Sequence, residues 1–154
     1  MGVEPTELLE KVPIFSRFTS AELELIGKRF TTREIDAGET LCREGDPGDN
    51  ICFVTSGRLT VYRSTVSGDK VQINTLNIGQ SFGEMALIEN TPRSATVKAY
   101  TPSRLLVLDR IDFEAIIAEH PAIGVKLYQG LALLLSRKLR QTSSRLVDYL
   151  VDRV

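Results

Sequence analysis

Between residues 33 and 108, short runs rich in Val, Ile, Thr and Phe alternate with glycine-bearing turns. This alternation limits the fold more than any other feature of the chain, because short strands joined by tight turns pair into antiparallel sheets. Six or more strands at this spacing predict a sandwich or jelly roll. The expected strands are residues 40–42, 51–56, 59–63, 71–76, 94–99 and 104–109.

Helices are expected on both sides of the strand region. Thr19 and Glu22 form a capping-box pattern at the start of a helix with one apolar face. After the last strand, Asp109 or Asp112 can cap a further helix, and Pro121 suits the first turn of a long final helix. We therefore predict one domain that is mainly β with flanking α-helices. Its N-terminal helices, strand region and C-terminal helices cover residues 1–32, 33–108 and 109–154.

The final helix carries an apolar stripe that must be buried. Its leucines recur at spacings of mostly four, at Leu127, Leu131, Leu135, Leu139, Leu146 and Leu150. The stripe can pack on the strand region of the same chain or against the same helix of a second copy. Both arrangements stay open, and the second one is a homodimer through the C-terminal helix.

Charge and apolar content argue against several classes of protein. Lys and Arg number 19 against 20 Asp and Glu, so the chain lacks the basic excess of a free-standing nucleic-acid binder. We expect no DNA binding by this chain alone. No apolar run approaches the roughly 18 to 20 residues that a membrane span needs. The acidic N-terminus lacks an apolar signal core, which favours a cytoplasmic location.

The chain has few of the residues that bind metals or act as catalytic nucleophiles. His120 is the only histidine, at the expected junction of two helices, and it has no companion for a metal cage or a catalytic relay. Cys42 and Cys52 are the only cysteines, and they lack a metal-ligand spacing. We expect buried free thiols, no metal and no enzymatic activity.

The stretch GQSFGEMALIENTPRSATV, residues 79–97, combines an acid, an arginine and a short helical run. If residues 83–87 form a turn of helix, the unpaired amides at its start attract an anion such as phosphate. Arg93 can add a fork of donors that grips two phosphate oxygens. Glu84 would repel a phosphate, but it can accept a hydrogen bond from a hydroxyl. Together these groups describe a site for a ribonucleotide whose phosphate lies close to its own sugar.

This stretch resembles the phosphate-binding cassette of the cyclic nucleotide-binding domain family, the fold of bacterial catabolite activator proteins and of protein kinase A regulatory subunits. The family pattern is approximately F-G-E-[LI]-[AG]-L followed by P-R-[SAT]-A, and this chain has FGEMAL and PRSA. The glycine-marked strands and the last two helices also look like those of the family, so the resemblance covers nearly all of residues 8–150. It implies an antiparallel β-roll of the jelly-roll type that carries the cassette.

The resemblance implies a role for each residue of the motif. Arg93 would bind the cyclic phosphate, and Glu84 would bind the ribose 2′-hydroxyl. The rest of the implied shell is Phe82, the amides of Gly83, Met85 and Ala95, Ala86, and the Ser94 hydroxyl. Ser94 leaves the identity of the base open, with a lean to cAMP over cGMP.

Four further residues would contact the base. Val61 and Ile73 stand where the family's β-roll supplies apolar contacts to the purine, although both are also expected in the core. Thr142 and Ser143 resemble the pair that activator proteins place against the adenine amino group. The alternative, that both are hydroxyls on a solvated helix surface, stays open.

The resemblance implies a binding module that acts as a sensor. A cyclic nucleotide would enter the site, and the last helix would close over the base as a lid whose position a partner detects. The alternative is the ligand-sensing part of a transcription regulator that lacks its helix-turn-helix domain. Residues 145–154 favour this alternative, because they resemble the hinge that precedes such a domain.

Overall fold

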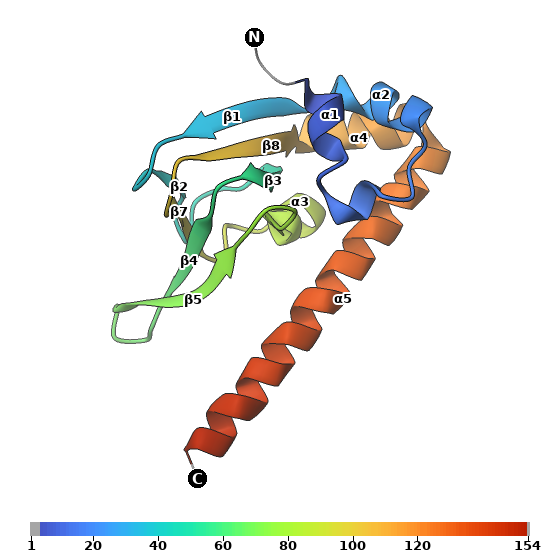
Figure 1. The fold of residues 1–154 in the computed structure, drawn as a ribbon. Helices are drawn as coiled ribbons and strands as arrows, with labels where there is room; N and C mark the ends of the chain where they lie inside the picture. The colour runs from blue at the N-terminus through green and yellow to red at the C-terminus, as the bar shows by residue number, and fades with distance from the viewer. Residues whose placement is uncertain (1–3, 154) are drawn as a thin grey trace.

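The structure, a computed structural model, describes residues 4–153. Two four-stranded antiparallel sheets form the body of the domain, with strand orders β1-β8-β3-β6 and β2-β7-β4-β5. This arrangement confirms the predicted jelly-roll type of fold (Figure 1). The strands are β1 (Thr31–Ile35), β2 (Thr40–Cys42), β3 (Asn50–Ser56), β4 (Leu59–Ser64), β5 (Lys70–Leu76), β6 (Ser81–Phe82), β7 (Thr96–Ala99) and β8 (Ser103–Asp109).

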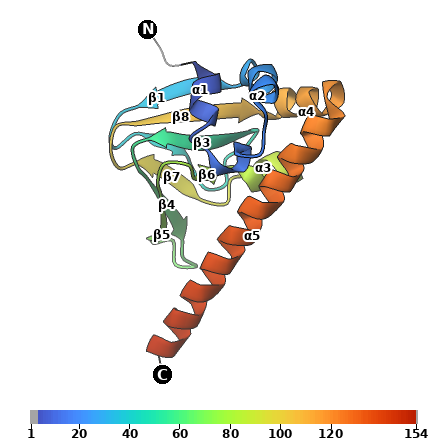
Figure 2. The same cartoon turned by 45° about the vertical axis from the view of Figure 1, so that its right-hand side comes forward.

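The helices gather at one end of the roll, apart from the long last one (Figures 1 and 2). They are α1 (Pro5–Leu9), the 3₁₀ turn η1 (Pro13–Phe15), α2 (Ser20–Gly27), α3 (Glu84–Glu89), α4 (Arg110–Glu119) and α5 (Pro121–Asp152). The predicted capping box at Thr19 and Glu22 is confirmed, with both reciprocal hydrogen bonds present. Pro121 occupies the first turn of α5, as predicted, and His120 is the residue between α4 and α5.

Strand β3 is buried on both faces, which explains why its sequence is apolar throughout. Ile51 and Phe53 pack into a cluster formed with the helices, whereas Cys52 and Val54 pack into a second cluster between the sheets. Successive side chains of a strand point to opposite faces, so one strand contributes to both clusters. Strand β8 is arranged in the same way, and these two strands join the helical end of the domain to the roll.

Helix α5 divides into a covered half and an exposed half. Leu127 and Leu131 are buried in the helical cluster. By contrast, Leu139, Leu146 and Leu150 are 69%, 55% and 54% exposed, where α5 passes α3 and continues beyond the sheets (Figure 2). Intramolecular packing therefore accounts for only the first part of the leucine stripe. None of the described helices is both long enough and apolar enough to span a membrane.

Two strands have weak sequence signals and were not predicted. β1 has the sequence TTREI with a single buried residue, and β6 has only two residues. Helix α4 begins at Arg110, with Asp109, one of the two expected caps, at the N-cap position but without a side-chain capping bond. β7 begins at Thr96, so Ser94 and Ala95 lie outside the ladder. Their polar groups therefore remain in the loop that carries the cassette.

Candidate functional site

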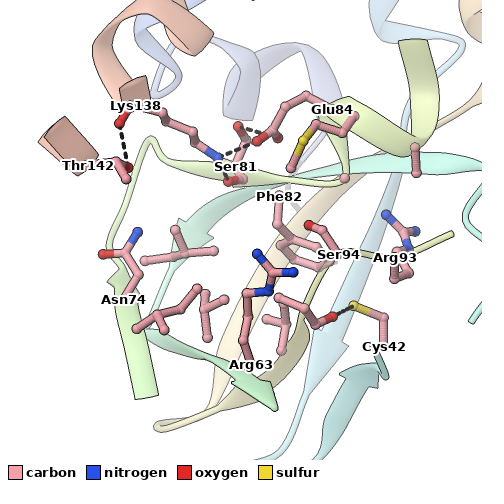
Figure 3. Close-up of a pocket in the computed structure, with 18 residues that line it drawn as sticks. Cys42, Arg63, Asn74, Ser81, Phe82, Glu84, Arg93, Ser94, Lys138 and Thr142 are labelled. Carbon is pink, nitrogen blue, oxygen red and sulfur yellow. Dashed lines mark hydrogen bonds and ion pairs between the residues drawn. The ribbon is translucent and has the colours of Figure 1, made fainter. Parts of the chain in front are cut away.

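A cavity of about 280 Å³ opens between the second sheet, α3 and α5. Figure 3 shows the side chains that line it. Of the twelve residues that the sequence assigned to a ligand site, eleven line this cavity. They are Val61, Ile73, Phe82, Gly83, Glu84, Met85, Ala86, Arg93, Ser94, Ala95 and Thr142. The structure thus brings together segments from β4, the 79–97 stretch and the last helix.

Gly83 forms the sharp junction between β6 and α3. Its φ of 97° and ψ of 2° lie in the left-handed region, which only glycine enters at low cost. A Cβ at this position would collide with the Arg93 guanidinium and with the Asn50 carbonyl. Because the first-turn amides of α3 cannot bond within the helix, this junction leaves donors beside the cavity.

Arg93 is held in place from β3. Its Nη1 donates to the Asn50 carbonyl at 3.0 Å and its Nη2 donates to Asn50 Oδ1 at 2.6 Å, while the side chain is 8% exposed. The backbone is also fixed, since the Arg93 amide donates to Asp46 and its carbonyl accepts from Gly45. No carboxylate pairs with Arg93 within residues 4–153, so its positive charge is held beside the cavity without an anionic partner.

Glu84 is only 4% exposed and pairs with α5. Its Oε1 accepts from Lys138 Nζ at 2.6 Å, and its Oε2 accepts from the Ser81 hydroxyl at 3.5 Å. Lys138 also donates to the Ser81 carbonyl at 2.6 Å. Sequence analysis missed Lys138, because it lies 54 residues from Glu84 and no local pattern connects them. Arg93 and Glu84 thus lie on different walls of the cavity (Figure 3). Arg93 is bonded to β3, and Glu84 is bonded to α5.

The apolar end of the cavity differs in part from the prediction. Val61 is buried in the cluster between the sheets, but Ile73 is 44% exposed, so the expectation that it belongs to the core is wrong. Val61 pairs with Asn74 and Tyr62 pairs with Gln72, which leaves Ile73 as an extra residue in β5. Such a bulge re-aims side chains. Ile73 and Asn74 both line the cavity as a result.

Only one of the two predicted hydroxyl residues of α5 lines the cavity. Thr142 does so, and its Oγ1 donates to the Lys138 carbonyl at 2.8 Å. Ser143 does not line the cavity, because consecutive residues of an α-helix point about 100° apart. Further along α5, Arg145 donates to the Ile73 carbonyl at 2.9 Å and to Asn74 Oδ1 at 3.1 Å. Helix α5 is therefore tied to the cassette and to β5.

Sequence reasoning missed seven residues that line the cavity. They are Cys42, Arg63, Asn74, Leu76, Ser81, Val97 and Lys138. A period of two along β4 from Val61 could have identified Arg63, since residues two apart share a face of a strand. Asn74 required knowledge of the bulge, and Lys138 required the path of α5.

The environment of the two thiols disfavours their ionised form. Burial raises the pKa of Cys52 to about 12, and burial also raises the pKa of Cys42, which is half-buried instead of fully buried as predicted. Both cysteines are free, and the raised pKa values disfavour the thiolate, which is the form that acts as a nucleophile or a metal ligand. Among residues 4–153, no group of three or more His, Cys, Asp or Glu side chains could hold a metal ion.

Comparison with known proteins decides the family. The family model described as the cyclic nucleotide-binding domain matches residues 32–120, which include the cassette and all eight strands except the first residue of β1. This chain belongs to the cyclic nucleotide-binding domain family. In this cyclic nucleotide-binding domain, residues of the motif that suggested the family line the cavity.

Individual relatives support the same assignment. The domain is 39% identical over 118 residues to a cyclic nucleotide-gated potassium channel of Rhizobium etli, covering 77% of this chain and 32% of the channel. It is 31% identical over 134 residues to the cyclic AMP receptor protein of Thermus thermophilus, covering 87% of this chain and 60% of that protein. The crystal structure of a cyclic nucleotide-binding domain from Methylobacillus flagellatus superposes with a TM-score of 0.86 at 27% identity, covering 95% of this chain and 82% of that one. The chain thus spans less than two thirds of the length of these two curated relatives.

Proposed function

We propose that this domain is a sensor that binds a cyclic nucleotide, cAMP in preference to cGMP, without catalysing a reaction. The observation that carries the proposal is the placement of Arg93, which is buried, fixed by Asn50 and without a carboxylate partner in the described residues. A guanidinium in this state has donors and charge available for a phosphate. Ser94 and the first turn of α3 line the same cavity and complete a phosphate-sized set of donors.

The other cavity walls suit the rest of such a ligand. Glu84 offers carboxylate oxygens to a ribose 2′-hydroxyl, and Val61 with Ile73 offers an apolar surface to a purine. Thr142 supplies a hydroxyl from α5 near the base end. The preference for cAMP is supported by Ser94 and by the name of the T. thermophilus relative, a cyclic AMP receptor protein.

Thermal unfolding of the chain with cAMP, cGMP or 5′-AMP tests the proposal. A ligand that binds only the folded state at about 100 times its Kd adds about 2.7 kcal/mol of stability, which raises the Tm by roughly 5–10 °C for a domain of this size. We expect the largest rise with cAMP, a smaller one with cGMP and little with 5′-AMP, whose phosphate is not ring-closed. An unchanged Tm with both cyclic nucleotides contradicts the proposal.

We propose that α5 responds to binding through the ion pair between Glu84 and Lys138. The Glu84 carboxylate is the acceptor for Lys138 in the structure and is also the proposed acceptor for the ribose. A ligand that bonds to Glu84 therefore competes with Lys138 for the carboxylate or changes the geometry of the ion pair. Binding then shifts the equilibrium between two positions of α5, by an amount set by the difference in the ligand's affinity for them.

Lys138→Met should uncouple α5 from the ligand. Methionine keeps an apolar stem but removes the charge, so buried Glu84 keeps only the Ser81 hydroxyl and the domain loses about 1–3 kcal/mol of stability. Hydrogen–deuterium exchange across residues 136–150 should then change little on addition of cAMP, in contrast to the parent chain.

Lys126→Met is the matched control for this experiment. Lys126 lies on the same helix and also donates to a carboxylate, Glu22, at 2.6 Å, but it does not line the cavity. The cAMP response of α5 should survive in this variant. An unaltered response in Lys138→Met would show that the ion pair does not carry the coupling.

We also propose that a second copy of the chain covers the exposed half of α5. Leu139 and Leu146 lie seven residues apart, the repeat of a coiled-coil seam, and Leu150 lies one turn further on. Sedimentation velocity should give the mass of a dimer for the parent chain and of a monomer for Leu146→Glu. Weak dimers form at protein concentrations on the order of tens of micromolar. A parent chain that sediments as a monomer at such a concentration contradicts this assembly.

The location and output of the sensor are further proposals. Free thiols at Cys42 and Cys52 fit a reducing compartment, so we place the domain in the cytoplasm. With a net charge of -1, this chain alone should not hold DNA. A match at 26% identity over 96% of this chain to a CRP-like cAMP-activated global transcriptional regulator of Mycobacterium tuberculosis favours the second candidate function, the ligand-sensing part of a transcription regulator.

A further inference from the structure

Strand β4 presents an arginine to the cavity that the residues of the cassette do not account for. Val61 and Arg63 both line the cavity, whereas Tyr62 between them stacks with Lys98, whose Nζ lies 5.9 Å from the ring centroid. This alternation follows from the period of two along a strand. Figure 3 shows the Arg63 side chain extended from β4 into the cavity, on the side where Ser94 lies.

The charges that line the cavity do not balance. Three cationic side chains, Arg63, Arg93 and Lys138, accompany a single carboxylate, Glu84. Lys138 already pairs with Glu84 at 2.6 Å, and the Arg93 guanidinium bonds only to the neutral Asn50. Within residues 4–153, Arg63 makes no side-chain hydrogen bond or ion pair. Two guanidinium groups therefore line one cavity without an anion between them, and an anion that binds there is attracted by both charges.

Phosphate oxygens match this pair better than the base does. A guanidinium donates only, so it cannot bond to the adenine amino group, and the neutral ring nitrogens of a purine attract its charge less than an anionic phosphate does. A phosphodiester has two non-bridging oxygens, and guanidinium groups bind such oxygens with well-defined geometry. Arg63 enters from β4 and Arg93 comes from the cassette, and Figure 3 shows Ser94 between them, where a bound phosphate would lie between the two arginines.

We propose that Arg63 is a second phosphate-binding arginine of this cavity, which closes on the ligand from the β4 side. The inference rests on the proposed function, because it assigns a further contact to the same cyclic nucleotide. Arg93 is the preorganised half of the pair, fixed by Asn50. Arg63 is the exposed half, and its side chain has no hydrogen-bond or ion-pair partner among residues 4–153.

Titration calorimetry of Arg63→Ala with cAMP and with cGMP tests this inference. Loss of one charge-assisted contact should weaken the Kd for both ligands by the same factor, about tenfold. The dependence of the Kd on salt concentration should also become shallower than in the parent chain. Arg63→Lys should recover part of the loss, because it restores the charge without the planar fork of donors.

Lys70→Ala is the matched control, since Lys70 lies in the same hairpin, pairs with Ser64 and does not line the cavity. Its Kd values should equal those of the parent, and the Tm of both variants without ligand should stay at the parental value. An unchanged Kd in Arg63→Ala overturns the inference, and so does a loss confined to cGMP, which would place Arg63 at the base. If the parent chain itself binds neither cyclic nucleotide, the proposed function fails together with the inference.

Discussion

Arg93→Ala is expected to weaken the Kd for cAMP by about a hundredfold or more. Each charge-assisted hydrogen bond to phosphate contributes roughly 1.5–3 kcal/mol, and the Arg93 guanidinium can make two of them, so the combined loss corresponds to more than two powers of ten. The buried position of Arg93 increases the effect, because a fixed side chain loses little entropy on binding. Titration calorimetry at a temperature well below the Tm measures the loss.

Two further variants distinguish the loss of a contact to phosphate from a nonspecific loss of structure. Arg93→Lys keeps the charge but lacks the planar fork, so we expect an intermediate Kd. Arg104→Ala removes a half-buried arginine that pairs with Glu34 outside the cavity, and its Kd should match that of the parent chain. If Arg93→Ala binds cAMP within about threefold of the parent, the phosphate-binding role of Arg93 is wrong.

Gly83→Ala is expected to lower both stability and affinity. A residue with a Cβ at the observed φ of 97° costs about 1–2 kcal/mol of strain, and its methyl group would also collide with the Asn50 carbonyl and the Arg93 guanidinium. The carbonyl belongs to the backbone of β3 and cannot move aside. We expect the free energy of unfolding to fall by roughly 2–4 kcal/mol and the Tm by about 5–15 °C.

Gly68→Ala is the control that separates the steric collision at Gly83 from the backbone strain of a positive φ. Gly68 has a similar φ of 92°, but a Cβ there meets nothing within 4 Å. This variant should show only the strain and should keep the parental Kd for cAMP, as measured by denaturation and calorimetry. Equal destabilisation in the two variants, with equal Kd values, would mean that the contact of Gly83 with Asn50 and Arg93 does not matter.

The cassette could be predicted from sequence because its parts are close together in the chain. A left-handed glycine at Gly83, an acid at the first position of α3 and Arg93 after a short loop all lie within residues 79–97. The partners of these residues could not be predicted. Asn50 lies 43 residues from Arg93 and Lys138 lies 54 residues from Glu84, and the distance between such residues depends on how the sheets and α5 pack.

The bulge in β5 is a second feature that could not be predicted from the sequence. Ile73 has the alternation of a core strand, yet the bulge opposite Val61 and Tyr62 turns it toward the cavity beside Asn74. The bulge arises from pairing with β4, a contact between strands that the residues of β5 do not specify by themselves. The period of two along β4 was visible in the sequence and could have placed Arg63 on the same face as Val61, but Arg63 was not predicted.

By itself, the sequence determined the strand-and-turn alternation, the capping box of α2, the start of α5 at Pro121 and the motif of residues 79–97. These features depend on backbone conformations and short-range contacts that a few neighbouring residues impose. Only the tertiary structure decided which leucines of α5 are covered. Leu131 and Leu146 belong to the same repeating pattern, but the first lies against the helical cluster and the second lies beyond it. Burial depends on where a helix runs relative to the rest of the domain, and a periodic pattern carries no information about that path.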